Sequence, residues 1–202
     1  MKTIEIVTSE RKVVGKKETK NLRKNGNVPC VIYGGEKVIH FYAHKNDFRH
    51  LIYTPNVYIV DLKIDDKECR AIMQDIQFHP VTDKILHIDF YEIFAGKNMI
   101  ISIPVKLHGL SIGVKEGGKL ALETRKLKVK ALPKNLPDFL DVDVTNLELG
   151  KTIKIRDLSY ENLELLDLKN SVVCSVKLTR VAKSMTDEEE VTEEESTETV
   201  EE

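Results

Sequence analysis

The chain has 202 residues, of which 41% are hydrophobic and 32% charged, and it contains no Trp. This length and composition provide for one large or two ordinary globular domains with hydrophobic cores. No apolar run approaches the ~20 residues that a membrane helix needs, and the opening MKTIEIVTSERK lacks the apolar core of a signal peptide, so we expect a cytoplasmic protein without a membrane partner.

The formal net charge of −2 hides an uneven distribution of charge. Ten acidic residues and no basic ones lie between Asp187 and Glu202, whereas the rest of the chain holds 31 basic and 23 acidic residues, a net of about +8. Residues 11–24 contain seven basic side chains against Glu18 alone. A cationic patch of this size suits a phosphate backbone, although a charge run is more commonly just a solvated surface.

The first 95 residues read as short strands separated by turns. Alternating or buried-strand patterns predict strands over 2–8, 28–33, 38–43 and 57–64, and then a hairpin that enters at Cys69 and leaves through 85–94. Helical spacing predicts short helices over 18–24 and 45–52, the second with Phe48, Leu51 and Ile52 facing inward. About six strands with little helix predict a six-stranded antiparallel β-barrel over residues 1–95.

The hairpin over residues 74–90 carries an unusual number of polar side chains. Its turn, HPVTDK, contains the chain breakers Pro80 and Asp83, and we expect His79 to stabilise it rather than to bind a ligand. Because side chains alternate along a strand, Ile76 and Phe78 are the expected inward pair. The outer face then shows side chains that both donate and accept hydrogen bonds, as the edges and hydroxyls of a polynucleotide require: Gln74, Gln77, His87 and Asp89.

Residues 96–182 predict a second β-rich domain, with strands over 100–107, 126–132, 140–144, 152–155 and 172–178. Its glycine-rich segment GVKEGGK lacks the spacing of a phosphate-binding loop, and we expect a flexible hairpin loop there. Residues 183–202 are acidic and free of aromatic residues, which predicts a disordered tail.

The sequence offers little for catalysis. The three cysteines, Cys30, Cys69 and Cys174, are scattered in strand-like sequence without a C-x-x-C pair, so we interpret them as reduced core residues. His87-Ile-Asp89 is half of a facial iron site, but such a site needs a distant third ligand, and the one later histidine is His108. We therefore expect no enzymatic activity, no metal, no cofactor and no small-molecule substrate.

Several motifs, in this order along the chain, resemble the bacterial large-subunit ribosomal protein family number twenty-five, and the length is similar to its two-domain Ctc, or general stress, form. The motifs are Arg11, Gly15-Lys16, Leu22-Arg23, VPCVIYGG (28–35), QDIQFHP (74–80) and LHIDF (86–90). The resemblance is specific over about residues 4–94 and looser to about 180. It implies a structural constituent of the large ribosomal subunit whose N-terminal barrel binds the minor-groove side of 5S rRNA.

The resemblance also implies roles for individual residues. Arg11, Lys16, Lys20 and Arg23 would hold phosphates, and Thr19 would add a hydroxyl contact. Tyr33, Gln74, Gln77, His87 and Asp89 would touch sugars or base edges. Since phosphates repel a carboxylate, Asp89 would accept from a base amino group or a 2′-hydroxyl, or else orient His87 or a basic side chain. The second domain would contact neighbouring large-subunit RNA or proteins.

Two points stay open from the sequence. Phe78 lies where members of the family often carry Arg, and it either packs inward or stacks on a base. The alternative function is a stress-related or tRNA-type RNA-binding module that is not stably part of the ribosome, because the expected barrel is also similar to the anticodon-binding part of glutaminyl-tRNA synthetase.

Overall fold

The structure is a computed structural model that describes residues 2–65, 67–94 and 96–179. The chain forms two compact units, each of which is described here by itself. The described residues of the first unit lie within 2–104, 128–139 and 162–164, and those of the second lie within 105–127, 140–161 and 165–179. Neither unit is a single continuous stretch of the sequence.

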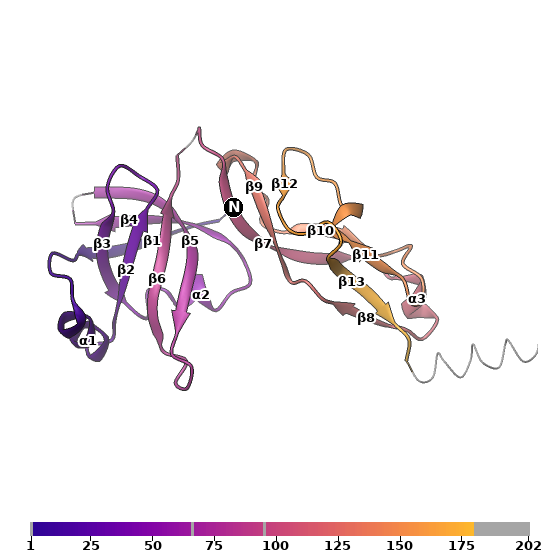
Figure 1. Cartoon of the computed structure of the whole chain (residues 1–202), viewed down its shortest axis with the longest axis horizontal. Helices are drawn as coiled ribbons and strands as arrows, with labels where there is room; N and C mark the ends of the chain where they lie inside the picture. Colours follow the sequence, from indigo (N-terminus) through magenta and orange to yellow (C-terminus); the bar gives the residue numbers. More distant parts are fainter. Residues whose placement is uncertain (1, 66, 95, 180–202) are drawn as a thin grey trace, which may run out of the picture. The chain divides into compact units, whose positions relative to one another are not determined.

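Six strands of the first unit close into a barrel in the order β1-β3-β2-β6-β5-β4 (Figure 1). Their bounds are β1 Lys2–Glu10, β2 Asn27–Tyr33, β3 Ile39–His44, β4 Tyr58–Ile64, β5 Lys67–Phe78 and β6 Ile85–Glu92. The predicted six-stranded barrel is confirmed, with one difference in pairing. Four neighbouring pairs are antiparallel as expected, but β1 pairs with β4, and β2 with β6, in parallel.

The barrel core is formed by the inward side chains of these strands and by the segment around α2 (Arg49–Ile52). Phe90 on β6 is fully buried, with its ring 5.6 Å from that of Phe41 and 6.2 Å from that of Phe48. Phe48 and Leu51 are buried, and Ile52 packs against the core, as predicted. The helix begins at Arg49 instead of Lys45 because residues 45–48 form a turn.

Helix α1 (Lys16–Lys24) begins two residues before its predicted start and buries Leu22. It ends at Asn25-Gly26, where Gly26 has φ of +78° and its backbone passes close to the ring of His44. A Cβ at Gly26 would lie 3.1 Å from the His44 ring nitrogen. Glycine suits this position because a positive φ carries no steric penalty without a Cβ.

The rest of the described chain is also β-rich, as predicted. It contains β7 Met99–His108, β8 Lys119–Leu122, β9 Lys126–Ala131, β10 Leu140–Asp143, β11 Thr152–Lys154, β12 Glu164–Leu165 and β13 Val172–Lys177, with the short helices α3 Ile112–Lys115, η1 Pro133–Asn135 and η2 Ile155–Asp157. These strands form a four-stranded sheet, β10-β7-β9-β12, and a three-stranded sheet, β11-β13-β8. Strands β8 and β12 were not predicted.

The glycine-rich segment 113–119 is not the flexible hairpin loop that its composition predicts. It contains the last three residues of α3 and the start of β8, and the Gly118 amide donates a 2.8 Å hydrogen bond to the Gly113 carbonyl. A Cβ at Gly118 would lie 2.5 Å from that carbonyl oxygen and from the side chain of Val176. Close packing therefore accounts for this glycine. The predicted disordered tail, 183–202, lies outside the described residues.

Two of the three cysteines are buried as predicted, Cys30 in the barrel and Cys174 on β13, and Cys69 is partly buried. Burial raises the pKa of the Cys30 thiol far above its ordinary value, with a smaller contribution in the same direction from the charge of Asp89. The Cys30 side chain is 1% exposed, so its thiolate would have to form without water around it.

This raised pKa gives a pH dependence that can be measured. The folded barrel holds the Cys30 proton more tightly than the unfolded chain does, so the stabilisation is complete below the unfolded pKa of about 8.5 and is lost as the pH rises above it. We expect the free energy of unfolding to fall by up to about 1.4 kcal/mol per pH unit from this group. Urea unfolding at pH 7.5, 8.5 and 9.5 should show a shallower decline for Cys30→Ala than for wild type, whereas equal declines would contradict the assignment.

Candidate nucleic-acid interface

The polar residues of the hairpin lie on the outer surface of β5 and β6. Gln77 pairs with His87, Ile76 with Ile88 and Asp75 with Asp89. Ile88 is fully buried, so its partner Ile76 faces the core and the flanking pairs face outward. Gln74 is exposed at an irregularity of the ladder between Met73 and Asp75. The outer surface formed by Gln74, Asp75, Gln77, His87 and Asp89 is called the polar face below.

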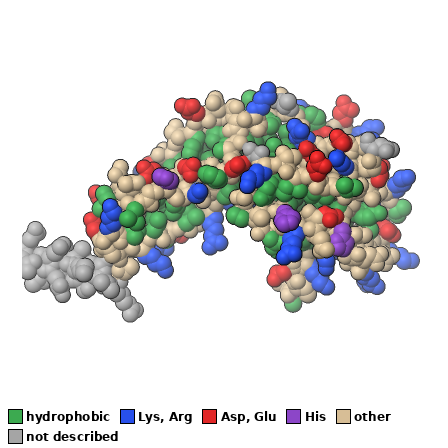
Figure 2. Space-filling model, turned by 180° about the vertical axis from the view of Figure 1, so that it is seen from behind, with side chains coloured by type: hydrophobic (Ala, Val, Ile, Leu, Met, Phe, Trp, Pro, Cys, Tyr) green, Lys and Arg blue, Asp and Glu red, His purple; other side chains and the backbone are tan. Residues whose placement is uncertain are grey.

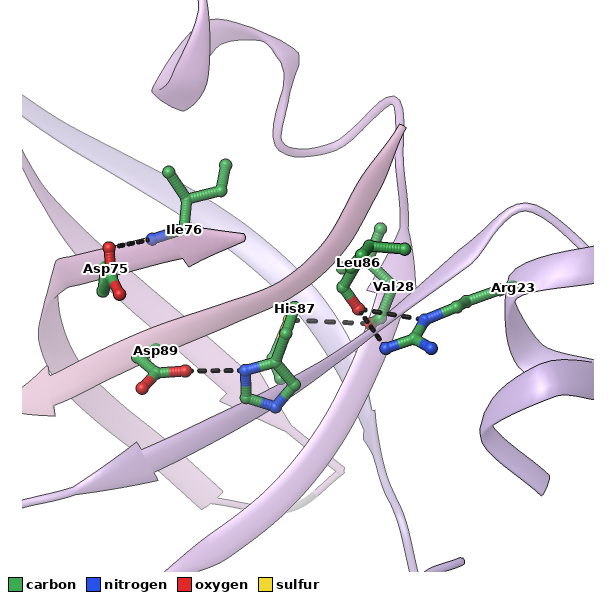
Figure 3. A network of polar contacts seen from close by, with 8 residues as sticks. Arg23, Val28, Asp75, Ile76, Leu86, His87 and Asp89 are labelled. Carbon is green, nitrogen blue, oxygen red and sulfur yellow. Dashed lines mark hydrogen bonds and ion pairs between the residues drawn. The ribbon is translucent and has the colours of Figure 1, made fainter. Parts of the chain in front are cut away.

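His87 and Asp89 are held together by a hydrogen bond of 2.6 Å between Nδ1 and Oδ1 (Figure 3). Their side chains are 26% and 29% exposed. A carboxylate can only accept, so Nδ1 carries the proton of this bond, and Nε2 is the nitrogen left for a ligand. This bond is the contact that the orienting role of Asp89 requires, and that role therefore enters the proposal below.

Asp75 also lies on the polar face and was not among the predicted site residues. It lies directly opposite Asp89, and its Oδ1 accepts a 2.8 Å hydrogen bond from the backbone amide of Ile76. Like charges directly opposite each other destabilise a sheet, and Asp89 has His87 as its partner. The sequence could have indicated Asp75, because it directly precedes the expected inward residue Ile76, and alternation along the strand then turns it outward.

Tyr33 lies at the edge of the polar face, where β2 runs parallel to β6. Its ring meets Tyr91 edge-on, with centroids 5.9 Å apart and an interplanar angle of 78°. Burial, followed by the charges of Asp89 and Asp75, raises the pKa of Tyr33, so its hydroxyl stays a donor. Gly34 has φ of +98°, and a Cβ there would lie 2.7 Å from the Tyr91 ring. Only a glycine lets the chain pass so close to this ring.

Phe78 does not form the predicted inward pair with Ile76. The ladder is irregular between Gln77 and Phe78, and Phe78 pairs with Ile85 at the end of β5 with 41% of its surface exposed. The extra residue at this irregularity is Leu86 on β6, and the regular pairing on which the prediction rested ends there. Phe78 is therefore a surface aromatic residue. His79 behaves as predicted, since its Nδ1 accepts hydrogen bonds from the amides of Val81 and Thr82 in the turn.

The predicted site residues that precede Arg23 form two groups: Arg11 and Thr19 are bonded to each other, and Lys16 and Lys20 are exposed. Arg11 and Thr19 bond to each other, with 2.7 Å between Nη2 and Oγ1, and both bond to the Gly15 carbonyl. These contacts fix the loop before α1. Lys16 and Lys20 are exposed one turn apart on α1, as their spacing predicted. Their ammonium groups are free to reach an anion in solution.

Arg23 connects α1 to the strand that carries the polar face. Its Nε and Nη2 donate to the Leu86 carbonyl at 3.1 and 2.8 Å, one residue before His87 (Figure 3). Arg23 thus places the cationic helix beside β6, a contact between residues 63 apart in the sequence that no local pattern indicates. In this structure, two of its three guanidinium nitrogens are engaged in that contact.

The face of the molecule seen in Figure 2 carries basic and acidic side chains interspersed, and histidines lie among them on the part that the barrel contributes. Within the described part of the chain, no group of three or more His, Cys, Asp or Glu side chains is placed to hold a metal ion. His87 and Asp89 bind each other instead of forming half of an iron site. No helix among the described residues is both long and apolar enough to cross a membrane.

A polar outer face on the barrel and an adjoining cationic helix are the surface features that the structure brings together. Residues 6–90 match the model of the Ribosomal L25p family, and residues 98–180 match that of the C-terminal domain of ribosomal protein TL5. Relatives named large ribosomal subunit protein bL25 are 55% identical in Phocaeicola vulgatus, 52% in Bacteroides fragilis and 46% in Porphyromonas gingivalis, each over 91% of this chain and 96% of the relative.

The chain belongs to the bL25 family of ribosomal proteins, in the form that carries a TL5-type C-terminal domain. This finding confirms the resemblance that the motifs indicated. It places the chain among ribosomal proteins and not among enzymes.

Proposed function

We propose that this protein is a structural constituent of the large ribosomal subunit in the bacterial cytoplasm, where the outer surface of its barrel binds 5S rRNA. Relatives at up to 55% identity are named as proteins of that subunit. The observation that carries the 5S rRNA assignment is the pairing of an oriented imidazole, His87 held by Asp89, with amide side chains on a rigid sheet. The TL5-type domain supports a second contact, with neighbouring ribosomal RNA or protein.

The polar face suits the minor groove of double-stranded RNA for a physical reason. That groove is wide and shallow and displays 2′-hydroxyls and base edges, which a nearly flat sheet can reach. Gln77 and His87 lie directly opposite each other and provide both donors and acceptors. The carboxylates of Asp75 and Asp89 repel phosphates. The flanking cations, among them Lys16 and Lys20, are therefore the groups that bind the phosphates of the RNA.

A binding comparison tests this function. Filter-binding titrations of the full chain against 5S rRNA and a tRNA, each at several salt concentrations, should show binding to 5S rRNA at least about tenfold tighter at 0.15 M salt. Binding to 5S rRNA should also survive added salt better, because direct contacts to sugars and bases do not depend on counterion release. Equal and steeply salt-sensitive binding to both RNAs would contradict the proposal and favour a general RNA-binding module.

A further inference from the structure

We propose that the barrel has a second nucleic-acid site, a basic groove that binds the phosphate backbone of an RNA strand and stacks one of its bases on Tyr53. This inference adds a contact to the proposed function and rests on it for the kind of RNA. The groove has a volume of about 540 Å³ and lies between the end of α1, the segment around α2 and the β5–β6 turn. Its charged residues are Arg23, Lys24, Lys45, Arg49, Lys84 and Asp83.

The groove is separate from the polar face. None of the five polar-face residues lines it, although both sites use β6. Leu86 marks the division, because it lines the groove and its carbonyl accepts hydrogen bonds from Arg23, whereas the next residue, His87, faces outward. A ligand in the groove therefore leaves the polar face uncovered, and both sites can be occupied together.

The charge of the groove points to a polyanion. Five cationic side chains and one carboxylate line a single cavity. Lys45, Arg49 and Lys84 are exposed, and within the described residues none of them forms an ion pair with an acidic group. Like charges that share a cavity repel one another unless a ligand of opposite charge enters. A ligand with several consecutive phosphates supplies several negative charges, whereas a ligand with a single carboxylate supplies one.

The neutral residues of the groove favour RNA as the source of those phosphates. Tyr53 is 67% exposed on the groove wall, so its ring is available to a planar partner. Asn27 and Asn46 line the same cavity. A cationic groove combined with an exposed aromatic ring is the arrangement that binds single-stranded nucleic acid, because every base has a face that can stack. The expected ligand is thus an unpaired stretch of RNA.

The test uses two double variants of the full chain that remove the same charge. Lys45→Gln with Lys84→Gln changes the groove, and Lys2→Gln with Lys67→Gln changes two exposed lysines that do not line it. The groove variant should bind 5S rRNA roughly 10- to 20-fold more weakly at 0.15 M salt, with the slope of log K against log salt reduced by about 1.4 to 1.8. The control variant should stay within about twofold of wild type.

Tyr53→Ala tests the stacking contact separately. It should lower the affinity roughly tenfold and leave the salt slope unchanged, because no cation is removed. Wild-type affinity and slope in the groove variant would overturn the proposal. If, in addition, a synthetic peptide of residues 187–202 binds to the wild-type chain but not to the groove variant, the ligand of the groove is the acidic tail and not RNA.

Failure of the groove is distinguishable from failure of the proposed function. If the groove variant keeps both its affinity for 5S rRNA and its preference for 5S rRNA over tRNA, the proposed second site in the groove is wrong and the proposed function stands. Absence of that preference in wild type, together with a groove-dependent salt slope on both RNAs, would overturn the proposed function and support the groove.

Discussion

Replacing Phe90 with alanine should lower the free energy of unfolding of the barrel by about 3–5 kcal/mol. Phe90 is fully buried against the rings of Phe41 and Phe48, so the substitution removes apolar contacts and leaves a cavity that the closed barrel cannot easily fill. Amide hydrogen exchange of β2 and β6 measures this quantity for the barrel itself.

Phe78→Ala is the matched control, because it makes the same chemical change at a residue that is 41% exposed. It should cost less than about 1 kcal/mol. Similar losses at the two positions would contradict the burial that the structure assigns to Phe90. The comparison matters for function, since Ile88 and Phe90 anchor in the core the strand that presents His87 and Asp89.

The strands were predictable wherever one face is buried. On β4, the burial alternates regularly from Val60 to Ile64, and the sequence pattern located that strand to within a residue. Strand β12 has two residues and β8 has four, so neither is long enough to show a clear period. The parallel pairings of β1 with β4 and of β2 with β6 join strands far apart in the sequence, which local patterns do not encode.

The orientation of the candidate site residues was predictable where side chains alternate regularly between the two faces of a strand. His87 and Asp89 share a face because they are two residues apart on a regular strand. Phe78 was placed inward because the alternation was extended to the last residue of β5, where β6 carries one extra residue, Leu86, and the regular pairing ends. Asp75 was not included, although it precedes the inward residue Ile76 and alternation along the strand turns it outward. The hydrogen bond from Arg23 to Leu86 depends on the tertiary fold. The sequence therefore predicted only a cation at Arg23, whereas the structure shows its guanidinium bonded to the backbone of β6.

Asp89→Ala should reduce the preference of the protein for 5S rRNA over tRNA by roughly tenfold or more and leave the salt slope nearly unchanged. The 2.6 Å hydrogen bond to His87 involves a charged group, and such bonds contribute about 1.5–3 kcal/mol. Without it, His87 is free to rotate, and Nε2 no longer has a fixed position toward the RNA. No cation that neutralises a phosphate is lost, so counterion release stays the same.

Two comparisons separate orientation of His87 from a simple effect of charge. Asp75→Ala removes the same charge directly opposite Asp89 but has no bond to His87, so it should change the preference for 5S rRNA much less. If Asp89 acts through His87, the double variant His87→Ala with Asp89→Ala should bind no worse than His87→Ala alone. Additive losses, or equal effects of the two aspartates, would mean that Asp89 contacts the RNA itself and that the polar face reads it through two independent groups.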